Sequence, residues 1–550
     1  MLPRDGHSPH RSGGGPKIEL NETALALVHA LTPPSYYTAD WEDPALAAVR
    51  HPGLMVAHGV FMCLAFFIFL PMGMALRSVK HPMHRLVVLA QWICTIFGIS
   101  YASVYRKLTP DMYSGQAHSK HGYVLLLIAL VITSFDTAAL LRRIFSFVRT
   151  GKFTLRGFSD ALKGAERASE SEYVGLMDEE EQSKSGDSGE EDSPGQWTNY
   201  IDAHSTNFPP SPGSDATLHD SHLQPRTPRS RLHLALKAAF TTVEFSLLFG
   251  GFTTLLSGIV VYTGGCREKF LTGCLAHLIK GGIFWSYGLL TFARFLGFCA
   301  EMGWAWNRAP SPGYPTAELV ESLVIFLYGA TNTWMERFSA MPGDPFTTKQ
   351  IQHIGIAVMF WFAGLLGMAV ESKRLRRWLA GHALAVDHSS ESRPVSESET
   401  FTLSFNPFPA LVIGVTGAVM AAHHQEYLFQ VQIHALWGNL ILAFAVMRCV
   451  TYIFLWVSPS NARPSAQSTL PSRPPSEALA SFFLAAGGIS FIFSTEEVTL
   501  AAMRRGRDDI MLFVVLAVSI TCIAFVWTVG VVGFQGWLKL RMGMRAKSTF

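Results

Sequence analysis

Histidines lie at matching depths in several long apolar segments of this sequence, and imidazole is an axial ligand of haem iron in many proteins. A haem b with two histidine ligands needs one imidazole from each of two neighbouring helices at the same depth in the membrane. Two pairs meet this condition: His58 with His118 near one membrane surface, and His84 with His233 near the other. Two haems bound in this way would form an electron path across the bilayer, so the sequence predicts haem b as a cofactor.

A second group of metal-binding side chains lies in the C-terminal half of the chain. It comprises His353, His423, His424, His434 and Glu496. Imidazoles combined with a carboxylate suit zinc, or iron or copper with an open coordination position. This group predicts a transition metal ion as the alternative to haem, in a metal-binding transporter or a metal-dependent membrane enzyme. A third hypothesis is a non-catalytic membrane scaffold whose histidines only form hydrogen bonds at the membrane surface.

The elements that must position these histidines are membrane-spanning helices. Hydrophobic residues make up 49% of the chain and charged residues 15%, a balance that favours the bilayer as the surrounding medium. A helix needs about twenty apolar residues to cross the hydrocarbon core. Such segments occupy residues 53–76, 86–105, 122–141, 239–263, 277–299, 318–339, 353–371, 408–423, 432–457, 478–500 and 510–537. The sequence therefore predicts an all-α, polytopic transmembrane helical bundle with about eleven spans.

The positions of Lys and Arg predict which ends of the spans face the cytosol. Clusters of these residues follow spans one, three, seven and eleven, and such residues resist translocation. This pattern places the N-terminus on the exoplasmic side and the C-terminus in the cytosol, although Arg504, Arg505 and Arg507 oppose it. A glycosylation acceptor at Asn21 and a disulfide between Cys266 and Cys274 would both fall on the exoplasmic side.

Other features of the sequence narrow the functional classes. A net charge of +3 over 550 residues gives no basis for nucleic-acid binding. No CxxC motif or dinucleotide-binding GxGxxG motif accompanies the spans, so a complete reductase within this chain is not expected. Electrons would have to come from a donor protein or a small reductant. The first span serves as the expected membrane-targeting signal, which predicts a location in the secretory-pathway or plasma membrane.

Three short motifs near the N-terminus resemble the first spans of cytochrome b561/DOMON-type ferric reductase modules. They are His58-Gly59, His84-Arg85, and His118 followed by Gly122, within about residues 50–145. The resemblance implies that His58, His84 and His118 are haem ligands. In that family the partner of His84 comes from the fourth span, where this chain offers His233 after a long polar insertion. His121 competes with His118 for the motif.

The remainder of the chain resembles the C-terminal domain of fungal YTP-like integral membrane proteins. The resemblance rests on AHLIKGG from Ala276, NPFPALVIGVTG from Asn406, HALWG from His434 and SRPPSEALASFF from Ser472. It implies a fold and a membrane location. The expected domains are an exoplasmic tail (1–50), a b561-like three-span module (50–145), a disordered cytosolic loop (146–232), a YTP-like eight-span domain (233–540) and a cytosolic tail (541–550).

The sequence also suggests that the bundle consists of two related halves. His353 followed by Gly355 echoes His58-Gly59, and the HxxxG motif at His434 echoes the one at His118. Charged residues within spans are costly unless they are paired. Glu244 and Arg294 are therefore expected to form an ion pair between neighbouring spans; a proton or substrate path through them is the alternative.

Overall fold

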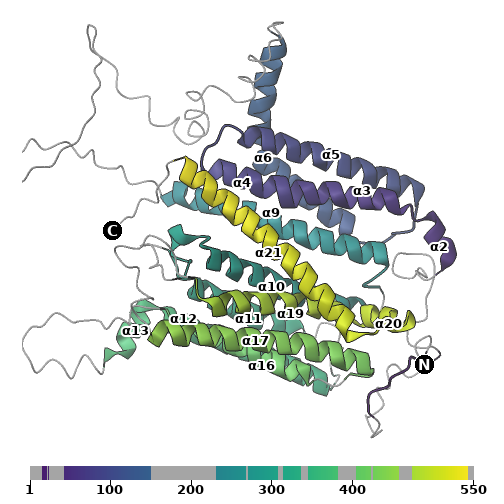
Figure 1. The fold of residues 1–550 in the computed structure, drawn as a ribbon, viewed down its shortest axis with the longest axis vertical. Coiled ribbons are helices and arrows are strands. Elements are labelled where there is room, and N and C mark those ends of the chain that lie inside the picture. Colours follow the sequence, from purple (N-terminus) through teal and green to yellow (C-terminus); the bar gives the residue numbers. More distant parts are fainter. Residues whose placement is uncertain are drawn as a thin grey trace, which may run out of the picture. The chain divides into compact units, whose positions relative to one another are not determined.

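The computed structural model describes residues 15–21, 23, 43–149, 231–267, 270–306, 314–335, 343, 345–381, 404–422, 425–457 and 473–542. Within these ranges the regular structure is helical, no strand occurs, and an isolated bridge pairs Lys17 with Tyr427. The predicted all-α fold is therefore confirmed (Figure 1). Of the loop predicted for residues 146–232, residues 150–230 lie outside the described residues.

The N-terminal part of the chain forms long apolar helices. They are α2 (Pro44–Val49), α3 (Pro52–Cys63), η1 (Leu64–Phe69), α4 (Leu70–Ser78), α5 (His84–Leu108), α6 (His118–Arg149) and α9 (Arg231–Thr263). Asp43 caps α2 by accepting a hydrogen bond from the backbone N–H of Ala45. Pro52 suits the start of α3, because the first N–H groups of a helix have no partner within it. The π-helix η1 joins α3 to α4, so the first predicted span is one continuous helical segment.

The C-terminal part continues with further helices. They are α10 (Leu271–Leu296), η3 (Ala300–Met302), α11 (Ala317–Met335), α12 (Thr348–Glu371), α13 (Lys373–Leu379), α16 (Phe408–Ala421), α17 (Leu428–Val457), α19 (Pro475–Phe493), α20 (Glu496–Arg504) and α21 (Ile510–Arg541). Thr347 and Gln350 form a capping box at the start of α12. Gly297, at a positive φ of 101°, ends α10.

Each of the eleven predicted spans overlaps a helix, with one interruption. The predicted span 478–500 is divided, because α19 ends at Phe493 and α20 begins at Glu496. Seven of the described helices are long and apolar enough to cross a membrane: Pro52–Ser78, His84–Leu108, Ala239–Thr263, Gln350–Glu371, Leu428–Val457, Pro475–Phe493 and Ile510–Arg541. The chain is a multi-pass membrane protein, and eleven spans remains a prediction.

The chain divides into two compact units. The first comprises Met1–Thr133 with Leu247–Phe550, and the second comprises Ser134–Ser246. In the first unit, Phe66 and Leu247 belong to the core of the N-terminal helices, and Trp437 and Phe444 belong to a larger core in the C-terminal helices. The described residues of the second unit are the last part of α6 and the first part of α9.

Glycines allow the C-terminal helices of the first unit to pack closely. A Cβ atom added at Gly281 of α10 would lie 2.7 Å from the Gly488 carbonyl oxygen of α19. A Cβ atom at Gly417 of α16 would lie 2.6 Å from the Gly438 carbonyl oxygen of α17. Small residues at such crossings let helix backbones approach each other, which is a principal source of helix association in membranes.

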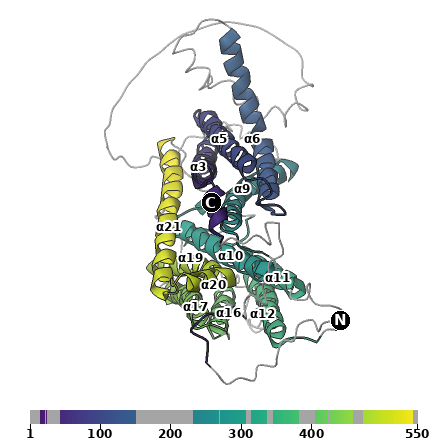
Figure 2. The same cartoon turned by 90° about the vertical axis from the view of Figure 1, so that its right-hand side faces the viewer.

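Helix α21 connects the two halves of the first unit (Figures 1 and 2). Leu538 of α21 packs with Ala75, Leu76 and Val79 of the α4 region. The indole N–H of Trp527 donates to the Phe67 carbonyl oxygen at 2.6 Å. Further along the same helix, Ala517 packs with Ala485 and Ile489 of α19. The N-terminal helices and the C-terminal helices of this unit therefore share one packed interface.

Candidate functional site

The rings of His58 and His118 lie side by side in the first unit. Their centroids are 6.3 Å apart and their planes are nearly perpendicular, at 87°. His58 belongs to α3, and His118 is the first residue of α6. The structure therefore brings together two side chains that were predicted to lie at the same depth.

Hydrogen bonds from two other helices hold the rings and assign their tautomers. The Nδ1 atom of His58 is 2.9 Å from the Gly98 carbonyl oxygen of α5, which only accepts, so Nδ1 carries the proton. The Nδ1 atom of His118 is 3.0 Å from the Ser257 hydroxyl of α9. That hydroxyl donates its own hydrogen to the Thr254 carbonyl oxygen, so Nδ1 of His118 is the donor. In the neutral form of each ring, the lone pair is on Nε2.

Glycines make room for this histidine pair. A Cβ atom added at Gly258 would lie 3.0 Å from Cε1 of His118, closer than most Cβ contacts in proteins. A Cβ atom at Gly98 would lie 3.1 Å from the Met62 side chain. The position of the His118 ring against α9 therefore depends on a residue without a side chain at position 258.

The spacing of the two rings suits a metal ion between them. With a metal–nitrogen bond of about 2 Å, two imidazoles on opposite sides of one ion have centroids roughly 6 Å apart. The observed separation of 6.3 Å is close to that spacing, and the two Nδ1 hydrogen bonds leave the lone pair of each ring on Nε2. Two imidazoles are the side chains that a bis-histidine haem needs as ligands.

His84 is anchored in the same manner at the other end of α5. Its Nδ1 atom is 2.9 Å from the Gly73 carbonyl oxygen of α4, which assigns the proton to Nδ1. His84 is the first residue of α5, and Gly98 lies fourteen residues later, or roughly 20 Å along the helix. The side chain of His233, the predicted partner of His84, lies outside the described side chains.

Among the second group of predicted ligands, the structure brings His434 next to His277. Their ring centroids are 6.0 Å apart and their planes are at 84°. The Nδ1 atom of His277 is 2.8 Å from the Gly273 carbonyl oxygen, and that of His434 is 2.8 Å from the Gln430 carbonyl oxygen. The sequence prediction left out His277, although this residue opens a span on the same predicted side of the membrane.

The other members of that group are distributed over several elements. His353 lies in the first turns of α12 and is half-buried. Glu496 is the exposed first residue of α20. His423 and His424 lie outside the described residues.

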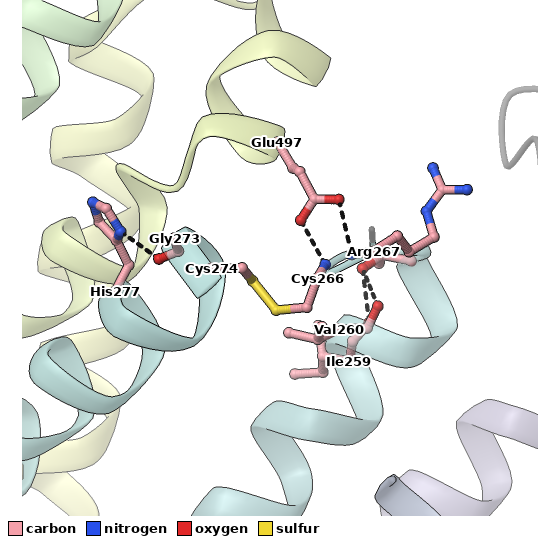
Figure 3. Close-up of a disulfide and its surroundings, with 9 residues drawn as sticks. Ile259, Val260, Cys266, Arg267, Gly273, Cys274, His277 and Glu497 are labelled. Carbon is pink, nitrogen blue, oxygen red and sulfur yellow. Dashed lines mark hydrogen bonds between the residues drawn. A yellow bond between two sulfur atoms is a disulfide. The ribbon is translucent and has the colours of Figure 1, made fainter. Parts of the chain in front are cut away.

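A disulfide borders the His277–His434 pair. Cys266 and Cys274 are bonded, as predicted, with their Cα atoms 5.3 Å apart. Cys274 lies three residues before His277, one turn along α10. The disulfide therefore ties the start of α10 to the loop that follows α9 (Figure 3).

Glu497 of α20, next to the predicted ligand Glu496, also binds the loop that follows α9. Its carboxylate accepts hydrogen bonds from the backbone N–H groups of Cys266, at 2.5 Å, and Arg267, at 3.5 Å (Figure 3). Burial raises the pKa of the Glu497 carboxyl, and these two hydrogen bonds oppose that rise. The oxygen atoms of Glu497 are therefore used to hold the backbone of the loop.

The acidic partners of Arg294 come from a different helix than the sequence predicted. Its guanidinium binds Glu318 at 2.8 Å and Glu321 at 2.7 Å. Both glutamates lie in the first turns of α11, and Arg294 lies in the last turn of α10. The sequence showed that Arg294 needs an acidic partner, but it did not show which helix supplies that partner.

Two known families match this chain. The family described as "Protein YTP1-like, C-terminal" matches residues 250–536, and the domain of unknown function DUF2427 matches residues 42–141. No solved structure matches the chain. The resemblance to cytochrome b561 modules remains a prediction.

Two fungal relatives are similar over long stretches. Uncharacterized membrane protein C3B8.06 of Schizosaccharomyces pombe is 31% identical over 486 residues, which cover 85% of this chain and 91% of that relative. Uncharacterized membrane protein YCR061W of Saccharomyces cerevisiae is 31% identical over 329 residues, which cover 56% of this chain and 50% of that relative. The family match over more than half of the chain and the similarity to C3B8.06 along most of its length show that this chain belongs to the YTP1-like family of membrane proteins.

Proposed function

We propose that this membrane protein binds haem b through His58 and His118 and moves electrons at the exoplasmic face of the membrane. The observation that carries the proposal is the 6.3 Å separation of two rings whose Nδ1 atoms are each held by another helix. A bound haem would supply reversible one-electron chemistry at its iron.

The chain's own residues orient the two ligands. Donation from Nδ1 to Gly98 and Ser257 fixes the plane of each ring and presents Nε2 as the ligating nitrogen. Such hydrogen bonds to the far side of an imidazole also raise the basicity of the ligating nitrogen. Four helices contribute to this arrangement, namely α3, α5, α6 and α9, so the ligand geometry depends on how they pack.

An inner haem extends the same proposal across the membrane. His84 has the same type of anchor, from Nδ1 to the Gly73 carbonyl oxygen, and His233 would be the second ligand. A protein partner or a small reductant would supply the electrons.

The test is a dithionite-reduced minus oxidised absorbance spectrum of the detergent-purified protein, with metal analysis of the same sample. Haem binding predicts sharp α and Soret bands that His58→Ala and His118→Ala both weaken strongly. His121→Ala is the matched control, because His121 is an exposed residue one turn further along α6. Flat spectra of a folded wild-type protein grown with sufficient haem would reject the proposal.

The His277–His434 pair favours a second candidate function, a transition metal site in a transporter or membrane enzyme. The ring separation of this pair, 6.0 Å, is similar to that of the first pair, and each Nδ1 atom is bonded to a carbonyl oxygen one turn earlier in its own helix. His423 and His424, which lie outside the described residues, would be the further ligands; the described His353 and Glu496 do not form a group of three or more ligands with this pair. This site predicts stoichiometric zinc, iron or copper without visible bands, lost on His434→Ala or His424→Ala and retained in His58→Ala. A difference spectrum without bands, from a sample that contains no metal, would favour the scaffold hypothesis.

A further inference from the structure

A short basic helix, α13, follows directly on α12. The apolar segment Gln350–Glu371 of α12 is long enough to cross a membrane, and α13 begins at Lys373 (Figure 1). Ser372 separates the two helices with an extended backbone, and its hydroxyl accepts a hydrogen bond from the backbone N–H of Leu375. Because the span ends at Glu371, α13 starts at the surface of the bilayer, on the predicted cytosolic side.

Positive charge is concentrated in α13. Four of its seven residues are basic, namely Lys373, Arg374, Arg376 and Arg377. A side-chain nitrogen of Arg376 is 3.4 Å from the Glu371 carbonyl oxygen, so this guanidinium is directed back to the last turn of α12. The other three basic residues are exposed, and within the described ranges neither Lys373 nor Arg374 forms an ion pair.

The three exposed cations lie on one face of the helix. At about 100° per residue, a single arc of roughly 100° contains Lys373, Arg377 and Arg374. We call these three residues the basic face. The arc beside it contains Trp378, Leu375 and Leu379. Helix α13 is therefore amphipathic, with a basic side next to an apolar side.

The apolar side of α13 exposes large side chains beyond the end of the span. Trp378 is 69% exposed and Leu379 is 68% exposed, seven and eight residues after Glu371. Tryptophan is enriched at the level of the lipid headgroups, because its ring is apolar and its N–H is polar. Basic amphipathic helices lie in this interface with the apolar side toward the acyl chains. The bilayer surface therefore accounts for both sides of α13.

The size of α13 favours a lipid over a protein as its partner. Seven residues of helix are roughly 10 Å long. Stable protein interfaces bury about 800 Å² on each partner, much more than one such helix offers. A phospholipid headgroup, in contrast, is about as large as the basic face. Clusters of at least four Lys or Arg directly after a span are also typical of binding to anionic lipids.

We propose that α13 is a binding site for an anionic phospholipid of the phosphoinositide class. The basic face binds the phosphate groups of the headgroup, and Trp378 holds the helix at the headgroup level. Guanidinium groups suit phosphate because two of their N–H groups can bind two phosphate oxygens at once. Three cations on one face match a headgroup with several phosphates, and they do not match phosphatidylcholine, whose choline cancels its phosphate charge.

This site is separate from the histidine groups. His353 lies in the first turns of α12, and α13 follows the last turn of that helix. Lipid binding at α13 therefore requires neither haem nor a metal ion.

Native mass spectrometry of the full chain tests the proposal. The protein is equilibrated in mixed micelles that contain phosphatidylcholine and phosphatidylinositol bisphosphate at equal concentrations, and the bound lipids are counted. We expect the wild type to retain the phosphoinositide in clear preference. Each Lys or Arg near an anionic surface changes affinity about fivefold, so a variant with Gln at all three positions of the basic face should lose up to about a hundredfold.

The matched control removes the same number of charges elsewhere. Arg504, Arg505 and Arg507 are exposed at the turn between α20 and α21, beside Asp508 and Asp509. Gln at these three arginines should leave phosphoinositide retention within about threefold of the wild type. An equal loss in both triple Gln variants would overturn the proposal, because it would show that only the net charge of the protein matters.

Two further measurements decide the question even where the triple Gln variant of the basic face does not fold. A variant with Lys373→Arg, Arg374→Lys and Arg377→Lys keeps every charge and should retain the phosphoinositide within about fivefold of the wild type. Raising the salt concentration from about 0.05 M to about 0.5 M should weaken retention by the wild type about tenfold or more, because salt screens exposed charges. Equal retention of the two lipids by the wild type, or retention that salt does not change, would overturn the assignment.

Discussion

Breaking the Arg448–Glu477 pair is expected to destabilise the protein more than a conservative charge change at any other ion pair of the described residues. Arg448 and Glu477 are 1% and 0% exposed, and two hydrogen bonds join them. Glu477→Gln keeps the volume and one acceptor but leaves the guanidinium with no opposite charge on α19. Removing one partner of such a pair costs about 3–5 kcal/mol, because the remaining charge stays buried.

The double variant separates the charge from the packing. Replacing both residues by Met removes the stranded charge and keeps much of the apolar volume, so we expect a loss of no more than about 1 kcal/mol. Glu301→Gln, at the exposed pair with Lys539, should change stability by less than about 1 kcal/mol. We therefore expect the wild type, Glu301→Gln and the double Met variant to have similar stabilities, and Glu477→Gln to be clearly less stable than all three.

The measurement is unfolding of the purified protein in mixed micelles with increasing SDS, followed by circular dichroism and tryptophan fluorescence. The two probes should give the same midpoint if the transition is two-state. A Glu477→Gln midpoint equal to that of Glu301→Gln would refute the reasoning, because it would mean that water reaches Arg448. A double Met variant as unstable as Glu477→Gln would instead show that shape, and not charge, dominates at this position.

Three further results are expected. Gly258→Ala, 3.0 Å from His118, should weaken or shift the haem bands, whereas Gly273→Ala, with nothing within 4 Å, should not. Cys274→Ser should lower stability by about 2–3 kcal/mol in denaturation midpoints through loss of the short disulfide loop. The raised pKa of Glu497 means that the folded chain holds this proton more strongly than the unfolded chain. Stability should therefore fall as pH rises through that raised pKa, and a stability-versus-pH curve of Glu497→Gln should lose this slope.

The sequence predicted the helices well because hydrogen bonding within the membrane requires them. Boundaries were less accurate, since polar residues extend many helices beyond the apolar segment, as the capping box at Thr347 does for α12. The largest error was the segment 478–500, which α19 and α20 share. The high average hydrophobicity of this segment predicted one continuous helix, although the structure has a turn at Ser494 and Thr495. Thr495 followed by two glutamates is a pattern typical of a helix start.

The sequence predicted the depth of the candidate site residues in the membrane, but not which side of each helix they face. Depth along a span follows from counting residues, and this count alone pairs His58 with His118. Which side chains meet also depends on how each helix is rotated, and that depends on packing partners far away in the sequence. For this reason His277 was missed, and Arg294 was assigned to Glu244 when Glu318 and Glu321 bind it.

The two histidine pairs share a sequence motif and a ring geometry. His58, His277 and His434 are each the seventh residue of their helices, about 9 Å from the helix start. His118 and His434 each begin an HxxxG motif, and each meets a perpendicular ring on another helix at about the same distance, 6.3 and 6.0 Å. The partner of His434 is His277, however, and not His353, which the internal echo of His58-Gly59 had suggested. A duplication that preserved one histidine of each pair would need the second histidine to have moved to a different helix. A test of whether the two halves have a common origin should therefore compare their HxxxG helices. His277 is the position at which the two halves differ.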